Sequence, residues 1–164
     1  MAMAMSLPRD AFVDGEIVIR ASGRLVIGRG LAISGVPVRS HLVVGPRGCL
    51  RIGDRVRISH GVSLSAHADV EIGDDVVIGP FCIVMDVDYH EVKDRDSRGT
   101  ARPIRIGKGV RLGAGVVVLR GATIGDGARI AAHSVVSRYV PPGTDASGVP
   151  ARPSPRPSGT RLRE

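Results

Sequence analysis

Apolar residues return every six positions along the second half of the chain. From Ile106 the hexads read IGKGVR, LGAGVV, VLRGAT, IGDGAR, IAAHSV and VSRYVP. Every first residue is aliphatic, every fifth is small or β-branched, and Gly or Ala stands second in four of the six. Six consecutive matches at two positions indicate a structural repeat.

The same pattern occurs earlier in the chain. Three hexads cover residues 52–69, and after a slip of two residues the pattern resumes over 72–83. A weaker stretch covers 27–38, and residues 16–20 (EIVIR) are predicted to form an opening strand. The repeat therefore extends over most of the chain.

A solenoid of short strands explains this period. The first and fifth residues of each hexad point inward, and Gly in second place allows a tight corner because it lacks a Cβ. Three hexads close one triangular coil, and each coil pairs with the next at about 4.8 Å, so that about six coils form a prism roughly 30 Å tall. Aromatic residues make up only 2% of the chain, so the core must consist of Val, Ile, Leu and Ala.

These repeats predict one β-helix domain at residues 16–150, between a partly disordered N-terminal segment (1–15) and a Pro/Arg-rich tail (151–164). The net charge is +7, and outside the tail it is scattered, without a basic, aromatic face for nucleic acid. No apolar stretch approaches a membrane span, and no signal peptide is evident, so we expect a cytoplasmic protein. Cys49 and Cys82 provide neither a disulfide framework nor a metal motif.

The hexads fail between Ile83 and Ile106. One coil needs 18 residues, so roughly 16 of those between Ile72 and Ile106 are predicted to leave the solenoid as a loop at about 84–103. This segment, VMDVDYHEVKDRDSRGTARP, is charged and contains a histidine. A loop expelled from a regular solenoid indicates a functional insertion.

Three further motifs follow the His-containing loop. They are PIRIG at 103–107, SVVSRYVPPG at 134–143 and GVPAR at 148–152. In this order they resemble the sugar O-acetyltransferase and xenobiotic acetyltransferase branch of the hexapeptide-repeat acyltransferases, over roughly residues 50–152. The resemblance implies an all-β fold, a single-stranded left-handed parallel β-helix, and it supplies the handedness, which periodicity does not. It also implies transfer of an acetyl or similar acyl group from acetyl-CoA, as co-substrate and without a metal, to a hydroxyl of a sugar or sugar-containing small molecule.

His90 stands in the loop, within the sequence DVDYH. A neutral hydroxyl is a poor nucleophile, and histidine titrates close enough to neutral pH to act as its general base. The resemblance identifies His90 with the catalytic histidine of the family. Asp86 and Asp88 alternate with it, so in an extended segment all three share one face, where either carboxylate can orient the imidazole or bind the acceptor. His60, expected to face outward, is a further candidate for acceptor binding.

For coenzyme A, the resemblance indicates contacts on the outer surface of the C-terminal coils. The positions are Gly113, Ala114, Ala131, Ala132, Ser137 and Arg138. Phosphate groups need cations, and Arg138 and Arg152 are the candidates, because a guanidinium matches phosphate geometry. The donor to the oxyanion is expected to be a backbone N–H near Gly113 or Ala114.

The sequence leaves the acceptor open. Arg111 stands where the family often has a Trp that shapes the acceptor cleft. N-acylation of an amino sugar is one alternative, and a hexapeptide carbonic anhydrase with zinc on His60 and His67 is another. A non-catalytic β-helix scaffold is the third. The resemblance also implies a homotrimer with active sites between adjacent subunits, which fits closed cyclic symmetry.

Overall fold

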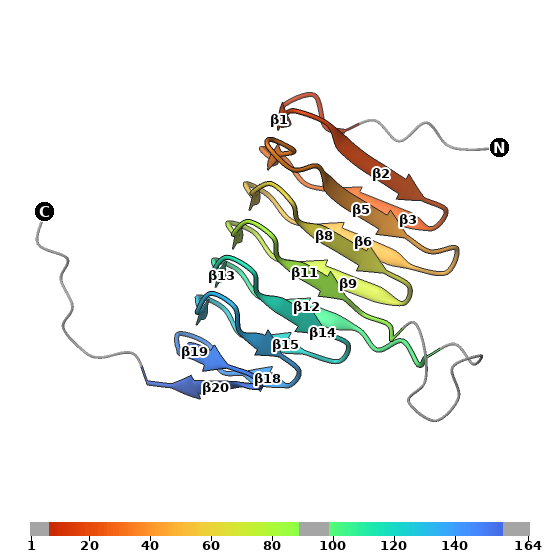
Figure 1. Ribbon diagram of the computed structural model, residues 1–164. Coiled ribbons are helices and arrows are strands. Elements are labelled where there is room, and N and C mark those ends of the chain that lie inside the picture. The colour runs from red at the N-terminus through yellow and green to blue at the C-terminus, as the bar shows by residue number, and fades with distance from the viewer. Residues whose placement is uncertain (1–6, 89–98, 156–164) are drawn as a thin grey trace, which may run out of the picture.

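The computed structural model of the protein describes residues 7–88 and 99–155. The regular elements in these ranges are all β-strands, stacked along one axis (Figure 1). The predicted fold, a left-handed parallel β-helix, is confirmed, with three parallel sheets forming its sides. In the described parts of the chain no helix is long and apolar enough to cross a membrane.

Each coil contributes one strand to each of three sheets, which we name A, B and C. Sheet A contains, in spatial order, β1 (Phe12–Asp14), β4 (Ala32–Ser34), β7 (Arg57–Ile58), β10 (Val77–Ile78), β13 (Arg111–Leu112), β16 (Arg129–Ile130), β19 (Asp145–Gly148) and β20 (Ala151–Ser154). Sheet B contains β2 (Ile17–Ala21), β5 (Ser40–Val44), β8 (Ser63–Ala66), β11 (Ile83–Met85), β14 (Val117–Leu119) and β17 (Val135–Val136). Sheet C contains β3 (Arg24–Ile27), β6 (Cys49–Ile52), β9 (Asp69–Ile72), β12 (Ile104–Ile106), β15 (Thr123–Ile124) and β18 (Tyr139–Val140).

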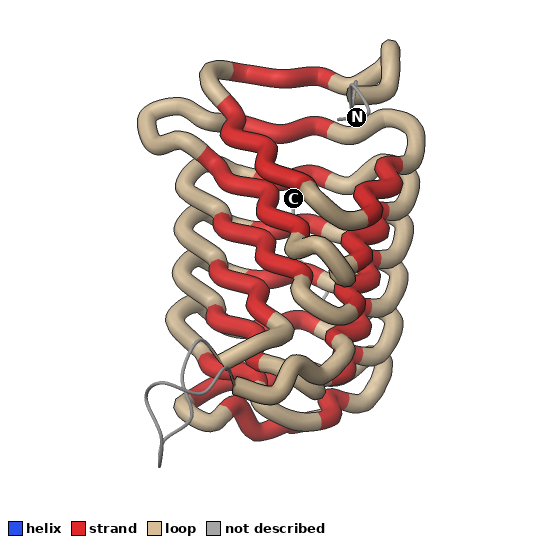
Figure 2. Tube along the Cα trace, turned by 90° about the vertical axis from the view of Figure 1, so that its right-hand side faces the viewer, coloured by secondary structure: helices blue, strands red, loops and turns tan. Residues whose placement is uncertain are grey.

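The core is a column of aliphatic side chains along the axis of the solenoid. The first and fifth residues of the six C-terminal hexads are all buried, as the repeat predicts. They are Ile106, Leu112, Val118, Ile124, Ile130 and Val136, with Val110, Val116, Ala122, Ala128, Ser134 and Val140. The coils stack directly on one another (Figure 2), and parallel pairing places like residues of successive coils over one another. Each coil therefore covers the apolar interior of the next.

Turns of successive coils form three corners along the solenoid. The A–B corner, between sheets A and B, contains residues 35–39, 59–62, 79–82, 113–116 and 131–134. The B–C corner contains residues 45–48, 67–68, 86–88, 99–103, 120–122 and 137–138. The C–A corner contains residues 28–31, 53–56, 73–76, 107–110, 125–128 and 141–144. The place of a hexad within its three-hexad coil therefore fixes the corner at which the turn of that hexad lies.

Strands extend beyond the predicted boundaries in three places. β1 pairs with β4, so the solenoid begins at Phe12 and not at residue 16. β20 belongs to the predicted tail, yet it pairs antiparallel with β19 and continues sheet A to Ser154. Val84 and Met85, predicted to open the loop, continue β11, because Val84 fills the core as Leu64 does one coil earlier.

Candidate active site

The loop leaves and re-enters the solenoid at one point of the B–C corner. Residues 86–103 connect β11 to β12, whereas only residues 67–68 connect β8 to β9 in the preceding coil. The backbone N–H of Arg102 donates to the carbonyl oxygen of Asp86 at 2.8 Å, which closes the neck of the loop. The predicted base, His90, lies outside the described residues.

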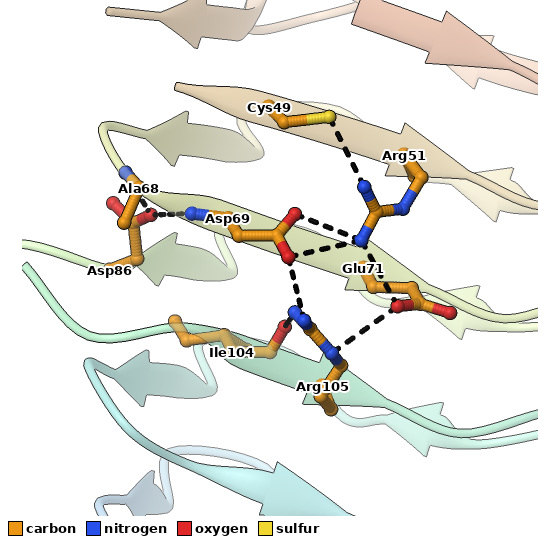
Figure 3. A network of polar contacts seen from close by, with 8 residues as sticks. All are labelled: Cys49, Arg51, Ala68, Asp69, Glu71, Asp86, Ile104 and Arg105. Atoms are coloured by element: carbon orange, nitrogen blue, oxygen red, sulfur yellow. Dashed lines mark hydrogen bonds and ion pairs between the residues drawn. The ribbon is translucent and has the colours of Figure 1, made fainter. Parts of the chain in front are cut away.

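Asp86 is a buried carboxylate at this neck. Its two oxygens accept hydrogen bonds from the backbone N–H groups of His67 (2.7 Å), Ala68 (2.7 Å) and Asp69 (2.8 Å), two of which Figure 3 shows. Three charge-assisted hydrogen bonds offset the loss of hydration of a fully buried carboxylate. Asp86 thus ties the first residue of the loop to the turn of the preceding coil. Its predicted role toward His90 or the acceptor stays a prediction, because the described part of the structure commits this carboxylate to the turn.

A cleft of about 540 Å³ opens beside the neck. Its walls are Gly45, Pro46, Arg47, His67, Val87, Asp88, Gly99 and Ala101. The imidazole Nδ1 of His67 lies 3.4 Å from the Ser65 hydroxyl and 4.0 Å from a carboxylate oxygen of Asp86. The ring also packs against the backbone of Gly45, where an added Cβ would lie 2.9 Å from it. His67 is therefore held in the cleft by three successive coils.

The predicted site did not include Arg120, and His67 was named only as a zinc ligand of the carbonic anhydrase alternative. Arg120 donates a hydrogen bond through Nε to the carboxylate of Asp88, a predicted site residue in the cleft wall. Both His67 and Arg120 lie at the B–C corner, in the coils just before and just after the loop. Their position within the 18-residue coil was the available signal in the sequence. Residues at the same corner, one coil before or after an insertion, lie next to its neck.

The two histidines predicted as zinc ligands, His60 and His67, do not meet within one chain. His60 lies at the A–B corner, edge-on to Phe81 with ring centroids 4.9 Å apart, and its Nδ1 is buried without a hydrogen-bond partner. His67 lies at the B–C corner, on the other side of sheet B. Within residues 7–88 and 99–155 no group of three or more His, Cys, Asp or Glu side chains is arranged to hold a metal ion.

The predicted coenzyme contacts fall in three places. Gly113 and Ala114 stack on Ala131 and Ala132 at the A–B corner, where an added Cβ on Gly113 would lie 2.6 Å from the nitrogen of Ala132. Ser137 and Arg138 lie at the B–C corner, and Arg152 lies in β20. Within one chain, the width of sheet B therefore lies between the neck of the loop and the predicted coenzyme contacts at the A–B corner.

The two candidates for the oxyanion donor differ in what their N–H groups bind. The N–H of Gly113 donates to the carbonyl of Ile130 at 2.9 Å, so it is used by the parallel ladder. The N–H of Ala114 donates to no described residue, which leaves it as the available donor. The buried thiol of Cys82 donates to the Gly113 carbonyl at 3.0 Å, and desolvation raises the pKa of this thiol to about 11. Cys82 thus stays protonated at neutral pH and supports the turn.

Comparison with known proteins agrees with this architecture. Residues 103–138 match the family described as bacterial transferase hexapeptide (six repeats). Rv3034c of Mycobacterium tuberculosis, named a probable acetyltransferase, is 32% identical over a match that covers 89% of this chain and 54% of that protein. The galactoside O-acetyltransferase of Escherichia coli is 33% identical over 63% of this chain and 52% of that enzyme. The chain thus spans about half the length of these relatives.

The match to one solved structure covers a larger share of the relative's length. The hexapeptide-repeat-containing acetyltransferase of Vibrio cholerae is 32% identical, with a TM-score of 0.68 over 79% of this chain and 72% of that one. Its complex with acetyl-CoA gives a TM-score of 0.62 at 29% identity, over 84% and 68% of the two chains. From its repeats, its fold and these relatives, the chain belongs to the hexapeptide-repeat acyltransferase family.

Proposed function

We propose that this chain transfers an acetyl group from acetyl-CoA to a hydroxyl of a sugar or sugar-containing small molecule. The observation that carries the proposal is the cleft at the neck of the loop, where His67 and Asp88 line a hollow of about 540 Å³. Its polar groups suit hydroxyl-bearing ligands, since imidazole and carboxylate both accept hydrogen bonds from hydroxyls. The acetyl-CoA complex of the Vibrio cholerae relative supports the donor, and the Escherichia coli galactoside enzyme supports the acceptor class.

In the proposed reaction, His90 takes the proton of the acceptor hydroxyl as its oxygen attacks the thioester carbon. The carbonyl π electrons move onto oxygen, and the N–H of Ala114 donates to that oxyanion. The intermediate then collapses, the carbon–sulfur bond breaks, and the proton on His90 passes to the coenzyme thiolate. Asp88, held by Arg120, and His67 bind the other hydroxyls of the acceptor.

The same proposal includes assembly of the site between subunits of a homotrimer. The neck of the loop lies at the B–C corner, whereas Gly113 and Ala114 lie at the A–B corner. A neighbouring subunit that presents its A–B corner to this B–C corner would complete the site. Exposed apolar side chains support such a contact, because Phe81 at the A–B corner is 51% exposed and Ile83 on sheet B is 38% exposed.

The test is release of free thiol from acetyl-CoA, measured over a panel of sugars and amino sugars. We expect acceptor-dependent release by the wild type and a loss of on the order of 100-fold or more in His90→Asn, because a general base contributes at least that much. His41→Asn, an exposed histidine of β5, is the matched control and should keep the wild-type rate. A wild-type rate in His90→Asn would remove His90 from the mechanism, and release with amino sugars alone would replace O-acylation by N-acylation.

A further inference from the structure

The turn at residues 45–48 extends the B–C corner beside the cleft at the neck of the loop. It has four residues, whereas the turn of the next coil consists of residues 67–68 alone. Three of the four, Gly45, Pro46 and Arg47, line the cleft of about 540 Å³. The longer turn therefore builds one wall of this cleft, and the base of the loop builds another.

Hydrogen bonds and close packing hold this turn in place. The N–H of Gly48 donates to the carbonyl of Gly45 at 2.9 Å, which closes a β-turn with Pro46 at its second position. The N–H of Gly45 donates to the carbonyl of Ala66 at 2.8 Å, and a Cβ added to Gly48 would lie 2.1 Å from that same oxygen. The proline ring also fixes its own φ. Arg47 thus stands on a backbone that is fixed before any ligand binds.

The carboxylates of the cleft and its neck already have partners. Asp86 is fully buried and accepts three backbone hydrogen bonds. Asp88, in the cleft wall, accepts a hydrogen bond from the guanidinium of Arg120. Arg47 differs, because its exposed guanidinium forms no ion pair or hydrogen bond with any residue of the ranges 7–88 and 99–155. Among the described residues, the cleft therefore carries one positive charge that no carboxylate balances.

The position of this charge in a cleft strengthens its attraction for an anion. Walls of low dielectric constant focus the field of a charge into the space that they enclose. Part of the wall opposite the turn is apolar, with the buried Val87 and the small residues Gly99 and Ala101. An ion pair with Arg47 is therefore less exposed to competing water than one on an open strand face.

We infer that the acceptor is an acidic sugar, whose carboxylate or phosphate group binds the guanidinium of Arg47. A guanidinium matches either group in paired hydrogen bonds. His67 and Asp88 remain for the hydroxyls of the same acceptor, so a few placed polar groups orient it in the cleft. This inference rests on the proposed function and narrows its acceptor from sugars in general to sugars that carry an anionic group.

The test compares acidic sugars with their neutral parents in the assay of free thiol released from acetyl-CoA. Galactose and glucose are each measured beside their 1-phosphate, their 6-phosphate and their uronic acid. We expect the wild type to show a kcat/KM at least about tenfold higher for an acidic derivative than for its parent, because hydrogen bonds between charged groups contribute that much. The phosphate and uronic acid series then identify which anion is bound.

Substitutions of Arg47 assign this preference to its guanidinium. Arg47→Gln should abolish the preference and leave kcat/KM for the neutral parents within about twofold of the wild type, since they make no ion pair. Arg47→Lys keeps the charge but not the paired geometry, so it should retain part of the preference. Arg57→Gln is the matched control, because it removes the same charge from the exposed face of β7 on sheet A and should keep the full preference.

Three results would overturn the inference while leaving the proposed function intact. One is a wild type that acylates neutral parents as well as their acidic derivatives or better. Another is a preference for acidic sugars that survives in Arg47→Gln. The third is an equal loss of preference in Arg57→Gln, which would mean a general electrostatic field in place of a local site. Thiol release with no sugar of the panel would instead remove the proposed function and the inference together.

Discussion

Two faces of the same solenoid treat their arginines in opposite ways. On sheet C, Arg51 and Arg105 flank two carboxylates, with Arg51 bound to Asp69 at 3.0 Å and Arg105 bound to Asp69 at 2.6 Å and Glu71 at 3.2 Å (Figure 3). On sheet A, the aligned neighbour of one arginine is another arginine. Strand geometry is the same on both faces, so the difference lies in the residues chosen.

That difference separates a balanced set of charges from an unbalanced one. Along sheet C the register alternates Arg51, Glu71 and Arg105, so three successive coils are joined electrostatically. In such a network the charges of the arginines are balanced by the neighbouring carboxylates. Along sheet A the pairing of Arg111 with Arg129 costs stability, because like charges directly opposite each other repel.

The largest effect is expected at Asp86. Its carboxylate is fully buried, whereas the side chain of Asp69 on sheet C is 24% exposed. Asp86→Ala leaves three backbone N–H groups without their acceptor, so we expect a loss of about 3 kcal/mol and a Tm lower by roughly 6–12 °C. Thermal unfolding followed by circular dichroism measures this. Asp88→Ala, at the same neck but with a side chain that is 43% exposed, is the control and should cost less than about 1 kcal/mol. Equal losses of stability in the two variants would show that the burial of a carboxylate does not determine how much its hydrogen bonds contribute to stability.

Much of this solenoid was predictable from sequence, because its rule is local. The residue type at the first and fifth hexad positions decided burial without knowledge of any distant contact, as for Ile106 and Val110. The arrangement of the site was harder to predict from the sequence. Whether Arg47 and His67 line one cleft depends on register across coils, which requires the corner lengths to be known.

The same limit applied to the neck of the loop. Asp86 stands near His90 in sequence, and its role as a catalytic partner stays a prediction. The hydrogen bond from the backbone of His67 to its carboxylate, one coil earlier, could be found only from the fold. The strand pairing of Ala151 to Ser154 was also missed, because a Pro-rich segment gives little local signal for an antiparallel edge strand.

A smaller effect tests whether charge interactions stabilise sheet C but destabilise sheet A. Asp69→Asn removes the carboxylate between Arg51 and Arg105, and we expect a loss of about 1 kcal/mol, discounted because the pairs are partly exposed. The loss should shrink in high salt, which screens such pairs. Arg129→Gln on sheet A should raise Tm slightly or leave it unchanged, since it relieves a like-charge contact. A lower Tm in Arg129→Gln would mean that this arginine is a structural element after all.

The smallest effect is expected from a substitution that gives sheet A the alternating positive and negative side chains of sheet C. Val77 lies between Arg57 and Arg111, so Val77→Glu places a carboxylate between two guanidiniums. We expect a gain of a few tenths of a kcal/mol, because cross-strand ion pairs are partly offset by the loss of a β-branched residue. Val77→Gln has nearly the same shape without the charge, so the difference in Tm between the two variants isolates the ion pairs. Equal Tm values in the two variants would show that alternating charges do not stabilise this face.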